Sequence, residues 1–253
     1  MNVDIIVPSN NVDNINKFIK SYMSLNLATR KNFRLKVVLN NIKDDRRIYC
    51  INEVDWIWYN DEFDIVPFLA LRWKAMEDSD ADFFLFLDDD HTFEEGSDRL
   101  LNNCLNFLHN HKECGLLQLE KANILKGFHV KKNAHVWTSR GLFIKNIGFN
   151  FGNFLNLVGA GEDLFVGYTA LVKGYIPYCH YNSTIKRNPP YTDNRYQELN
   201  NPSYSEDLLD KNIVGFIRQI YDDPDWRFYG SLENLKYPNK LKEIIQKTLT
   251  ELI

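Results

Sequence analysis

The chain has 253 residues, of which 44% are hydrophobic and 25% charged, so it can bury a core and is not a disordered polymer. Its formal net charge of −4 excludes a protein that is a polycation overall. The four cysteines are far apart and form no C-x-x-C pair, which predicts reduced thiols and a place in the cytoplasm, the host cytoplasm if the protein is viral. We expect no signal peptide and no membrane span, because no run approaches about 20 apolar residues.

The first part of the chain alternates short apolar runs with segments of helical periodicity. This alternation predicts an α/β protein with a mostly parallel sheet flanked by helices. The predicted strands are 3–9, 35–41, 54–60 and 82–90, and the predicted helices are 11–23 and 65–77.

The second part begins with the same kinds of element and then changes in character. We predict a helix over 97–111, a strand over 114–120, a lysine-rich loop, an apolar strand around 141–148 and a helix beginning near Glu162. Proline-rich turns and a final helical pattern follow. The sequence therefore predicts a catalytic domain over 1–184 and a mostly helical C-terminal extension over 185–253 packed on the core.

Polar residues follow three of the predicted strands at the point where each strand ends. These are Ser9–Asn10, Asn40–Asn41 and the run from Asp88 to Asp90. Parallel sheets bind ligands at the carboxyl ends of their strands, so we expect the functional site at this edge.

The stretch FLFLDDDHTF, residues 83–92, sets three adjacent carboxylates after an apolar run. The carboxylates repel one another, and a hard divalent cation such as Mg²⁺ or Mn²⁺ would compensate them. The simpler interpretation is a solvated acidic turn. Two enzyme classes use such a strand end: haloacid-dehalogenase-like phosphatases, whose D-x-D-x-T string matches 88–92, and nucleotide-sugar glycosyltransferases with a D-x-D motif.

A second motif favours the glycosyltransferases. GAGEDLFVGYTALVKGY, residues 159–175, resembles the G-x-G-E-D segment of inverting GT-A type (Rossmann-like), family-two-like glycosyltransferases. The resemblance covers about residues 2–182. It implies transfer of a sugar from a nucleotide-diphosphate sugar to an acceptor hydroxyl with inversion, a Mn²⁺ or Mg²⁺ ion, and Asp163 as the general base beside Glu162. The phosphatase interpretation lacks a G-D-x-x-x-D motif.

The resemblance also implies a set of ligand-binding residues, with a UDP-sugar as the expected donor. Asn40 stands where the family often has an acidic residue that contacts uracil, so the identity of the base is left open. The expected metal ligands are Asp88, Asp90 and His180. The expected donor-binding residues are Pro8, Ser9, Asn10, Asn40, Arg72, Lys74, Asp88 and Asp89.

The acceptor is suggested by one local feature. Residues 121–145 contain six Lys or Arg residues, interleaved with aromatic residues and histidines, and no Asp or Glu. Such a segment suits a polyanion, and it raises a hydroxymethylated base in phage DNA as the acceptor. A cell-surface glycan acceptor and a catalytically inactive sugar-nucleotide-binding module stay open as alternatives. The expected acceptor-binding residues are Lys131, Lys132, Trp137 and Arg140.

Overall fold

A computed structural model describes residues 1–42, 48–49, 51–59, 68–121, 128, 130–132, 141–148, 170 and 173–188. The elements in these ranges follow in chain order: β1 (Val3–Ser9), α1 (Val12–Met23), α2 (Leu27–Arg30), β2 (Phe33–Asn40), β3 (Val54–Tyr59), α3 (Phe68–Met76), β4 (Phe83–Phe86), β5 (His91–Phe93), α4 (Ser97–Asn110), β6 (Cys114–Lys121), β7 (Val130–Lys132), β8 (Leu142–Lys145), β9 (Ile176–Ser183) and β10 (Ile185–Arg187).

A mixed eight-stranded sheet forms the centre of the molecule, with the order β3-β2-β1-β4-β8-β6-β9-β7. The strands β3, β2, β1 and β4 are parallel to one another, and β6 is parallel to β9. Only β8 and β7, among the strands described, run opposite to the rest of this sheet. The predicted α/β class with a mostly parallel sheet is therefore confirmed. Separately, β5 and β10 form a small antiparallel sheet.

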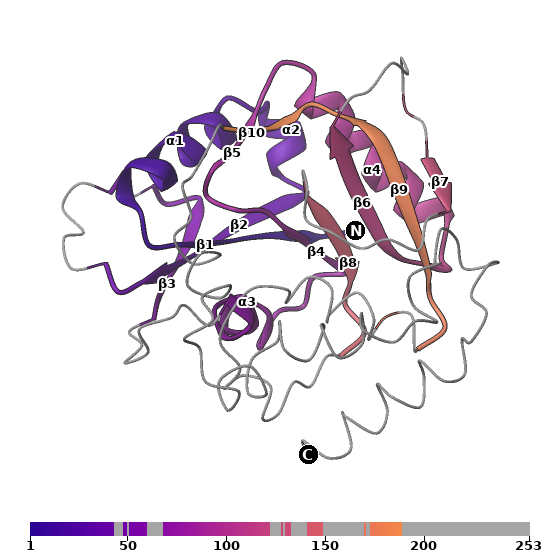
Figure 1. Ribbon diagram of the computed structural model, residues 1–253, viewed down its shortest axis with the longest axis horizontal. Helices are drawn as coiled ribbons and strands as arrows, with labels where there is room; N and C mark the ends of the chain where they lie inside the picture. Colours follow the sequence, from indigo (N-terminus) through magenta and orange to yellow (C-terminus); the bar gives the residue numbers. More distant parts are fainter. Residues whose placement is uncertain are drawn as a thin grey trace, which may run out of the picture.

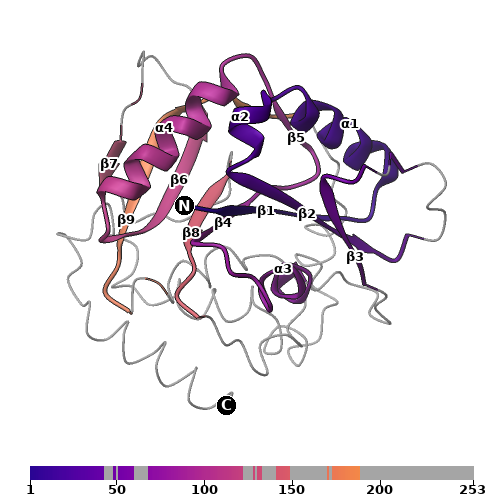
Figure 2. The same cartoon turned by 180° about the vertical axis from the view of Figure 1, so that it is seen from behind.

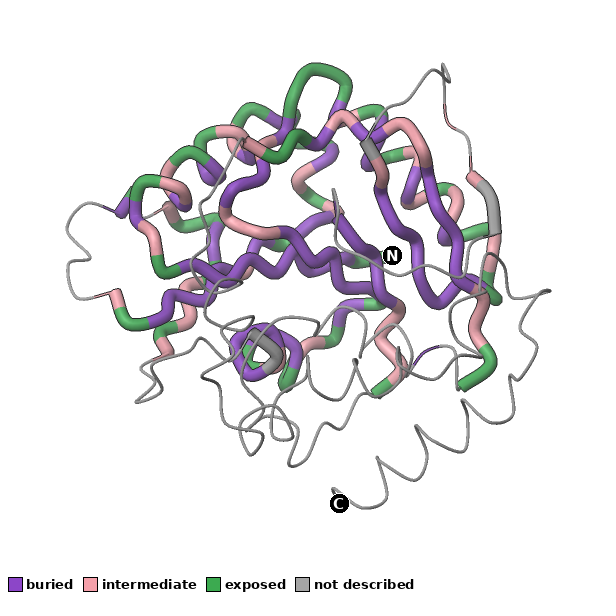
Figure 3. The backbone as a smooth tube through the Cα atoms, in the orientation of Figure 1, coloured by how far each residue is buried: buried purple, intermediate pink, exposed green. Residues whose placement is uncertain are grey.

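Helices cover both faces of the large sheet. Figures 1 and 2 show α1, α2 and α4 on one face and α3 on the other. The residues of β1 alternate between the two faces, and Val3, Ile5 and Val7 join the hydrophobic core together with Phe18 of α1 and Leu101 of α4. The central strands are buried along their length (Figure 3), as their near-continuous apolar sequences require.

Local sequence signals explain the connection between β1 and α1. Asn11 caps the helix, because its side-chain oxygen accepts hydrogen bonds from the backbone N–H groups of Asp13 and Asn14. The acidic Asp13 in the first turn also suits the positive end of the helix dipole. The chain consequently leaves the carboxyl end of β1 in a short, defined turn and returns over the sheet.

The predicted elements agree with the structure wherever apolar periodicity is strong. The helix expected over 11–23 and the strand expected over 3–9 are present almost residue for residue. The strand expected over 82–90 is shorter, because β4 ends at Phe86 and the acidic triplet turns the chain into β5. The short strands β5, β7 and β10 and the strand β9 were not predicted. The helix expected near Glu162 lies outside the described residues.

Candidate functional site

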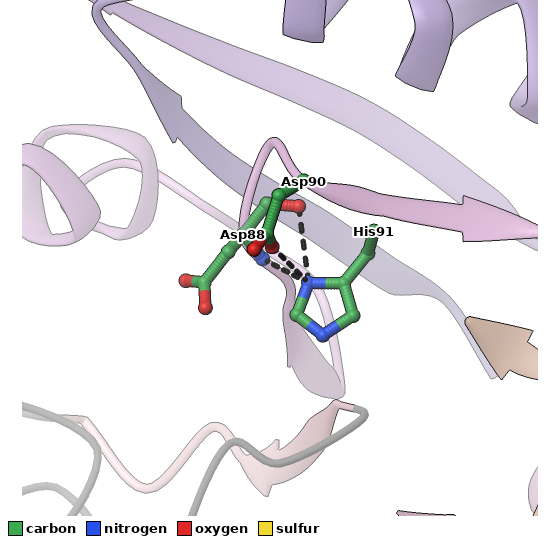
Figure 4. A group of neighbouring side chains, drawn as sticks. All are labelled: Asp88, Asp90 and His91. Carbon is green, nitrogen blue, oxygen red and sulfur yellow. Dashed lines mark hydrogen bonds and ion pairs between the residues drawn. The ribbon is translucent and has the colours of Figure 1, made fainter. Parts of the chain in front are cut away.

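The acidic triplet occupies the turn between β4 and β5, at the carboxyl end of the parallel half of the sheet. β4 lies beside β1, with Phe86 opposite Ile6, so the triplet emerges next to the end of β1. Figure 4 shows Asp88 and Asp90 in this turn and the ring of His91 at the start of β5. The three side chains offer ligand atoms that all lie within 4.8 Å of one another.

Asp88 is held by a buried arginine. The Nη2 atom of Arg72 lies 3.0 Å from Oδ1 of Asp88, and its Nη1 donates to the carbonyls of Ile6 and Leu87. The guanidinium also lies 4.4 Å from the centre of the Phe86 ring. Because the Arg72 side chain is 0% exposed, its charge depends on these protein groups. Arg72 therefore fixes the ends of β1 and β4 relative to the first carboxylate of the triplet.

Asp89 faces β1 and α1. Its carboxylate accepts hydrogen bonds from Ser9 Oγ at 2.6 Å and from Asn14 Nδ2 at 3.4 Å. Burial raises the pKa of Asp89 to about 6, and the neighbouring charges of Asp88 and Asp90 act in the same direction. The middle carboxylate is thus tied to the loop after β1, where the resemblance implies donor-binding residues.

Asp90 is bound from the opposite side, by β10. Its Oδ2 accepts a hydrogen bond of 2.8 Å from Nε of Arg187, and its backbone carbonyl accepts two from Asn188. Its Oδ1 is buried and has no hydrogen-bond partner among the described residues, and it lies 3.4 Å from Nδ1 of His91. A buried carboxylate oxygen in this state retains lone pairs for a ligand.

The donor set suits a hard divalent cation held by carboxylate oxygens. Asp88 and Asp90 supply such oxygens, which Mg²⁺ and Mn²⁺ prefer. Nδ1 of His91 lies 3.0 Å from the backbone nitrogen of Asp88, 3.2 Å from the Asp88 carbonyl oxygen and 3.4 Å from Asp90 Oδ1, so this ring atom is engaged within the turn. The residues present therefore fit a cation bound by Asp88 and Asp90, with His91 supporting the turn.

The other predicted donor-binding residues, apart from Lys74, lie at the ends of β1 and β2. Pro8 and Ser9 are buried and Asn10 is exposed, which places the polar end of the β1 loop at the surface. Asn40 is 2% exposed, and its Oδ1 has no hydrogen-bond partner in the described part of the chain. Lys74 lies on the exposed side of α3 and pairs with Glu77 at 3.1 Å.

His180 lies in β9, and the group of neighbouring carboxylates and imidazoles at Asp88 and Asp90 does not include it. Its ring stacks on Phe128 at a centroid distance of 4.4 Å, and its Nε2 lies 3.2 Å from the Asn182 carbonyl oxygen. It lines a separate pocket beside the start of α4.

The remaining predicted residues are described only in part. Lys131 and Lys132 belong to β7, at the edge of the large sheet, and only their backbone is described. The residues Glu162, Asp163, Trp137 and Arg140 lie outside the described residues.

Sequence reasoning missed His91, Arg187 and Asn188 as parts of the site. His91 stands inside the DDDHT string, so its position was a usable signal. Arg187 follows Asp90 by 97 residues, and no local pattern connects the two.

Within the part of the chain that the structure describes, no helix is both long and apolar enough to cross a membrane.

No protein-family model matches the chain, and no curated protein matches it by sequence. Its fold is nevertheless found in solved structures. The crystal structure of S. aureus TarS 1–349 matches 100% of this chain and 83% of its own length at 15% identity, with a TM-score of 0.52. The complex of S. aureus TarS 1–349 with UDP-GlcNAc matches 83% of this chain at 14% identity, with a TM-score of 0.55. These values show a shared fold.

The chain spans less than two thirds of the ligand-bound TarS chains. The match covers 64% of the chain in complex with UDP-GlcNAc and 59% of the chain in complex with UDP, the latter with 16% identity over 73% of this chain and a TM-score of 0.49. What TarS binds in these crystals is thus a property of TarS.

Proposed function

We propose that this chain is a metal-dependent glycosyltransferase that moves a sugar from a UDP-sugar to an acceptor hydroxyl. The observation that carries the proposal is the pair Asp88 and Asp90 at the carboxyl end of β4, with one buried oxygen of Asp90 that has no hydrogen-bond partner among the residues described. The shared fold with TarS, which was crystallised with UDP-GlcNAc, supports a nucleotide-sugar as the ligand of this edge.

The residues around the triplet have separate tasks in this proposal. Asp88 and Asp90 would hold Mn²⁺ or Mg²⁺, which supplies Lewis-acid stabilisation of the departing diphosphate. Arg72, which lies on α3, keeps Asp88 in place by its hydrogen bond to the carboxylate. Asn40 offers a buried acceptor oxygen at the end of β2, suited to an N–H group of the nucleotide base.

The acceptor side of the reaction follows from the resemblance stated above. Asp163 would take the proton of the acceptor hydroxyl as general base, and Glu162 would lie beside it at the start of a helix. A single displacement with this base inverts the anomeric carbon. The configuration of the product, measured by NMR against that of the donor, tests the inversion.

For the acceptor we propose a polyanion, with a hydroxymethylated base in DNA as the specific candidate. The support is the basic segment 121–145, of which β7 carries Lys131 and Lys132 at the edge of the sheet. Phosphate contacts weaken steeply with salt. The electrophoretic mobility shift that the protein causes in duplex DNA should therefore diminish as the salt concentration is raised. Salt-independent binding, or no binding, would remove DNA from the proposal and leave a glycan acceptor.

A panel of nucleotide-sugars tests the donor proposal. The melting temperature should rise with a UDP-sugar in the presence of Mn²⁺ and rise much less when EDTA replaces Mn²⁺, since a ligand of the folded state alone stabilises it. Asp90→Asn should abolish the Mn²⁺-dependent part of this rise in melting temperature. The matched control is Asp98→Asn in α4, away from the triplet, which should respond like the unmodified protein. A response that ignores Mn²⁺ and Asp90 would contradict the proposal.

A further inference from the structure

An arginine from the far end of the described chain already holds one oxygen of a carboxylate in the proposed cation site. Arg187 ends β10, which pairs with β5 so that Arg187 stands opposite His91. Its Nε lies 2.8 Å from Oδ2 of Asp90. The Asp90 side chain is 10% exposed and that of Arg187 is 48% exposed, so the carboxylate is buried while the guanidinium borders solvent.

The backbone of Asp90 is attached to β10 independently of this ion pair. The backbone N–H of Asn188 and its Nδ2 donate to the Asp90 carbonyl at 2.9 and 3.0 Å. These bonds hold the turn against β10 whether or not the guanidinium is in place. The half-exposed side chain of Arg187 can therefore leave the carboxylate by rotation while the strand stays paired.

A divalent cation and a guanidinium cannot both hold the Asp90 carboxylate without repulsion. Two positive groups within a few ångströms of one another in a partly buried site repel strongly, because little water screens them. Arg72 already compensates Asp88. A cation bound by Asp88 and by Oδ1 of Asp90 would thus weaken the contact that Arg187 makes with Oδ2 of Asp90.

We propose that Arg187 is the resident counter-charge of Asp90 and competes with the divalent cation for that carboxylate, so that it sets the cation affinity of the site. The inference rests on the proposed metal-dependent function. Arg187 is a positioning residue in this role: it orients the Asp90 carboxylate before the cation arrives, and it releases the carboxylate when the cation binds.

Isothermal titration with Mn²⁺, without any donor, tests this at low ionic strength. Arg187→Gln should tighten Mn²⁺ binding about two- to fivefold, the range expected for loss of a partly exposed competing ion pair. Arg187→Lys keeps the charge but loses the fork geometry, so it should tighten binding to a smaller extent. Because lysine keeps the positive charge, tighter Mn²⁺ binding by Arg187→Lys would come from loss of the direct contact with Asp90 and not from a change in net charge.

Lys186→Gln is the matched control, because it removes the same charge one residue away. Lys186 pairs with Glu94 at 3.4 Å and both side chains are half exposed. The Mn²⁺ affinity of the Lys186→Gln variant should equal that of the unmodified protein. Far-ultraviolet circular dichroism and melting temperature, measured for every variant, confirm that each is folded.

The outcomes separate this inference from the proposed function. If Mn²⁺ binds the unmodified protein and binds Arg187→Gln no more tightly, the competition is refuted while the metal site stands. Binding by Arg187→Gln alone would support the competition in its strongest form. If neither protein binds Mn²⁺, the metal-dependent function fails and the inference fails with it.

Discussion

Ser9 and Asp89, which are 80 residues apart in the chain, are joined by a hydrogen bond of 2.6 Å from Ser9 Oγ to Asp89 Oδ2. The bond ties the end of β1 to the middle carboxylate of the triplet. Asn14 of α1 adds a longer contact to the other oxygen of Asp89. The triplet is consequently divided: Asp89 is bound by β1 and α1, and Asp88 and Asp90 are the two carboxylates that we propose to share a cation.

The raised pKa of Asp89 predicts a specific pH dependence of stability. Below its ordinary pKa of 3.8 the Asp89 carboxyl group is protonated in both the folded and the unfolded chain, so its titration does not change the free energy of unfolding there. Between that value and about 6 the unfolded chain loses the proton while the folded chain keeps it. Stability from this group therefore falls as pH rises through this window and is constant above it.

Asp89→Asn should remove this dependence. In EDTA, the melting temperature of Asp89→Asn minus that of the unmodified protein should increase from about pH 4 to about pH 6 and then level off. Differential scanning fluorimetry across this range measures the difference, in which the titration of other groups cancels. A difference that is flat from pH 4 to 7 would show that Asp89 has an ordinary pKa.

Arg72 should be sensitive to replacement by lysine although the charge is kept. A lysine cannot reach Asp88 and the two backbone carbonyls at once, so buried acceptors lose their donors. We expect Arg72→Lys to lower the free energy of unfolding by about 2 kcal/mol, measured by urea denaturation. Lys74→Ala, two residues along the same helix and exposed, should change it by less than about 0.5 kcal/mol. Equal effects would contradict the buried role of Arg72.

Asp4 forms a buried ionic cluster on the α3 side of the sheet. Its side chain is 0% exposed and binds Nε of Arg34 at 2.7 Å, Nζ of Lys36 at 2.9 Å and Oγ of Ser79. Asp4→Ala leaves the largely buried Lys36 without its carboxylate partner, while Arg34 keeps Asp80, so it should lower the free energy of unfolding by about 3 kcal/mol. Urea denaturation measures it. Asp80→Ala removes a solvent-exposed partner of Arg34 and should leave the urea midpoint nearly unchanged.

Asp163→Asn tests the proposed general base. Loss of a positioned base should lower the transfer rate by about 10²–10⁴-fold, while Mn²⁺-dependent binding of the UDP-sugar stays intact. Rates of sugar transfer and donor affinities are measured on the same preparation. Full activity of Asp163→Asn would assign the base to another residue, and loss of donor binding would indicate a role in the donor site.

Sequence reasoning identified the elements whose signals are local. Apolar periodicity predicted β1, α1, β2 and α4 within a few residues, because a buried strand or an amphipathic helix needs a continuous pattern. The acidic triplet was found for the same reason: its three residues are adjacent and follow an apolar run. The shorter strands β5 and β10 were missed, since three residues are too few to show a period.

The amino-acid order alone was enough to establish an α/β sheet with a polar edge and an acidic turn on it, since hydrophobic burial and charge repulsion act on neighbouring residues. Folding in three dimensions decided which charge meets each aspartate. Arg72, Ser9 and Arg187 come from α3, β1 and β10, and only strand pairing and the packing of α3 on the sheet bring them to one turn. Coulomb forces depend on distance in space, and distance along the chain does not report it.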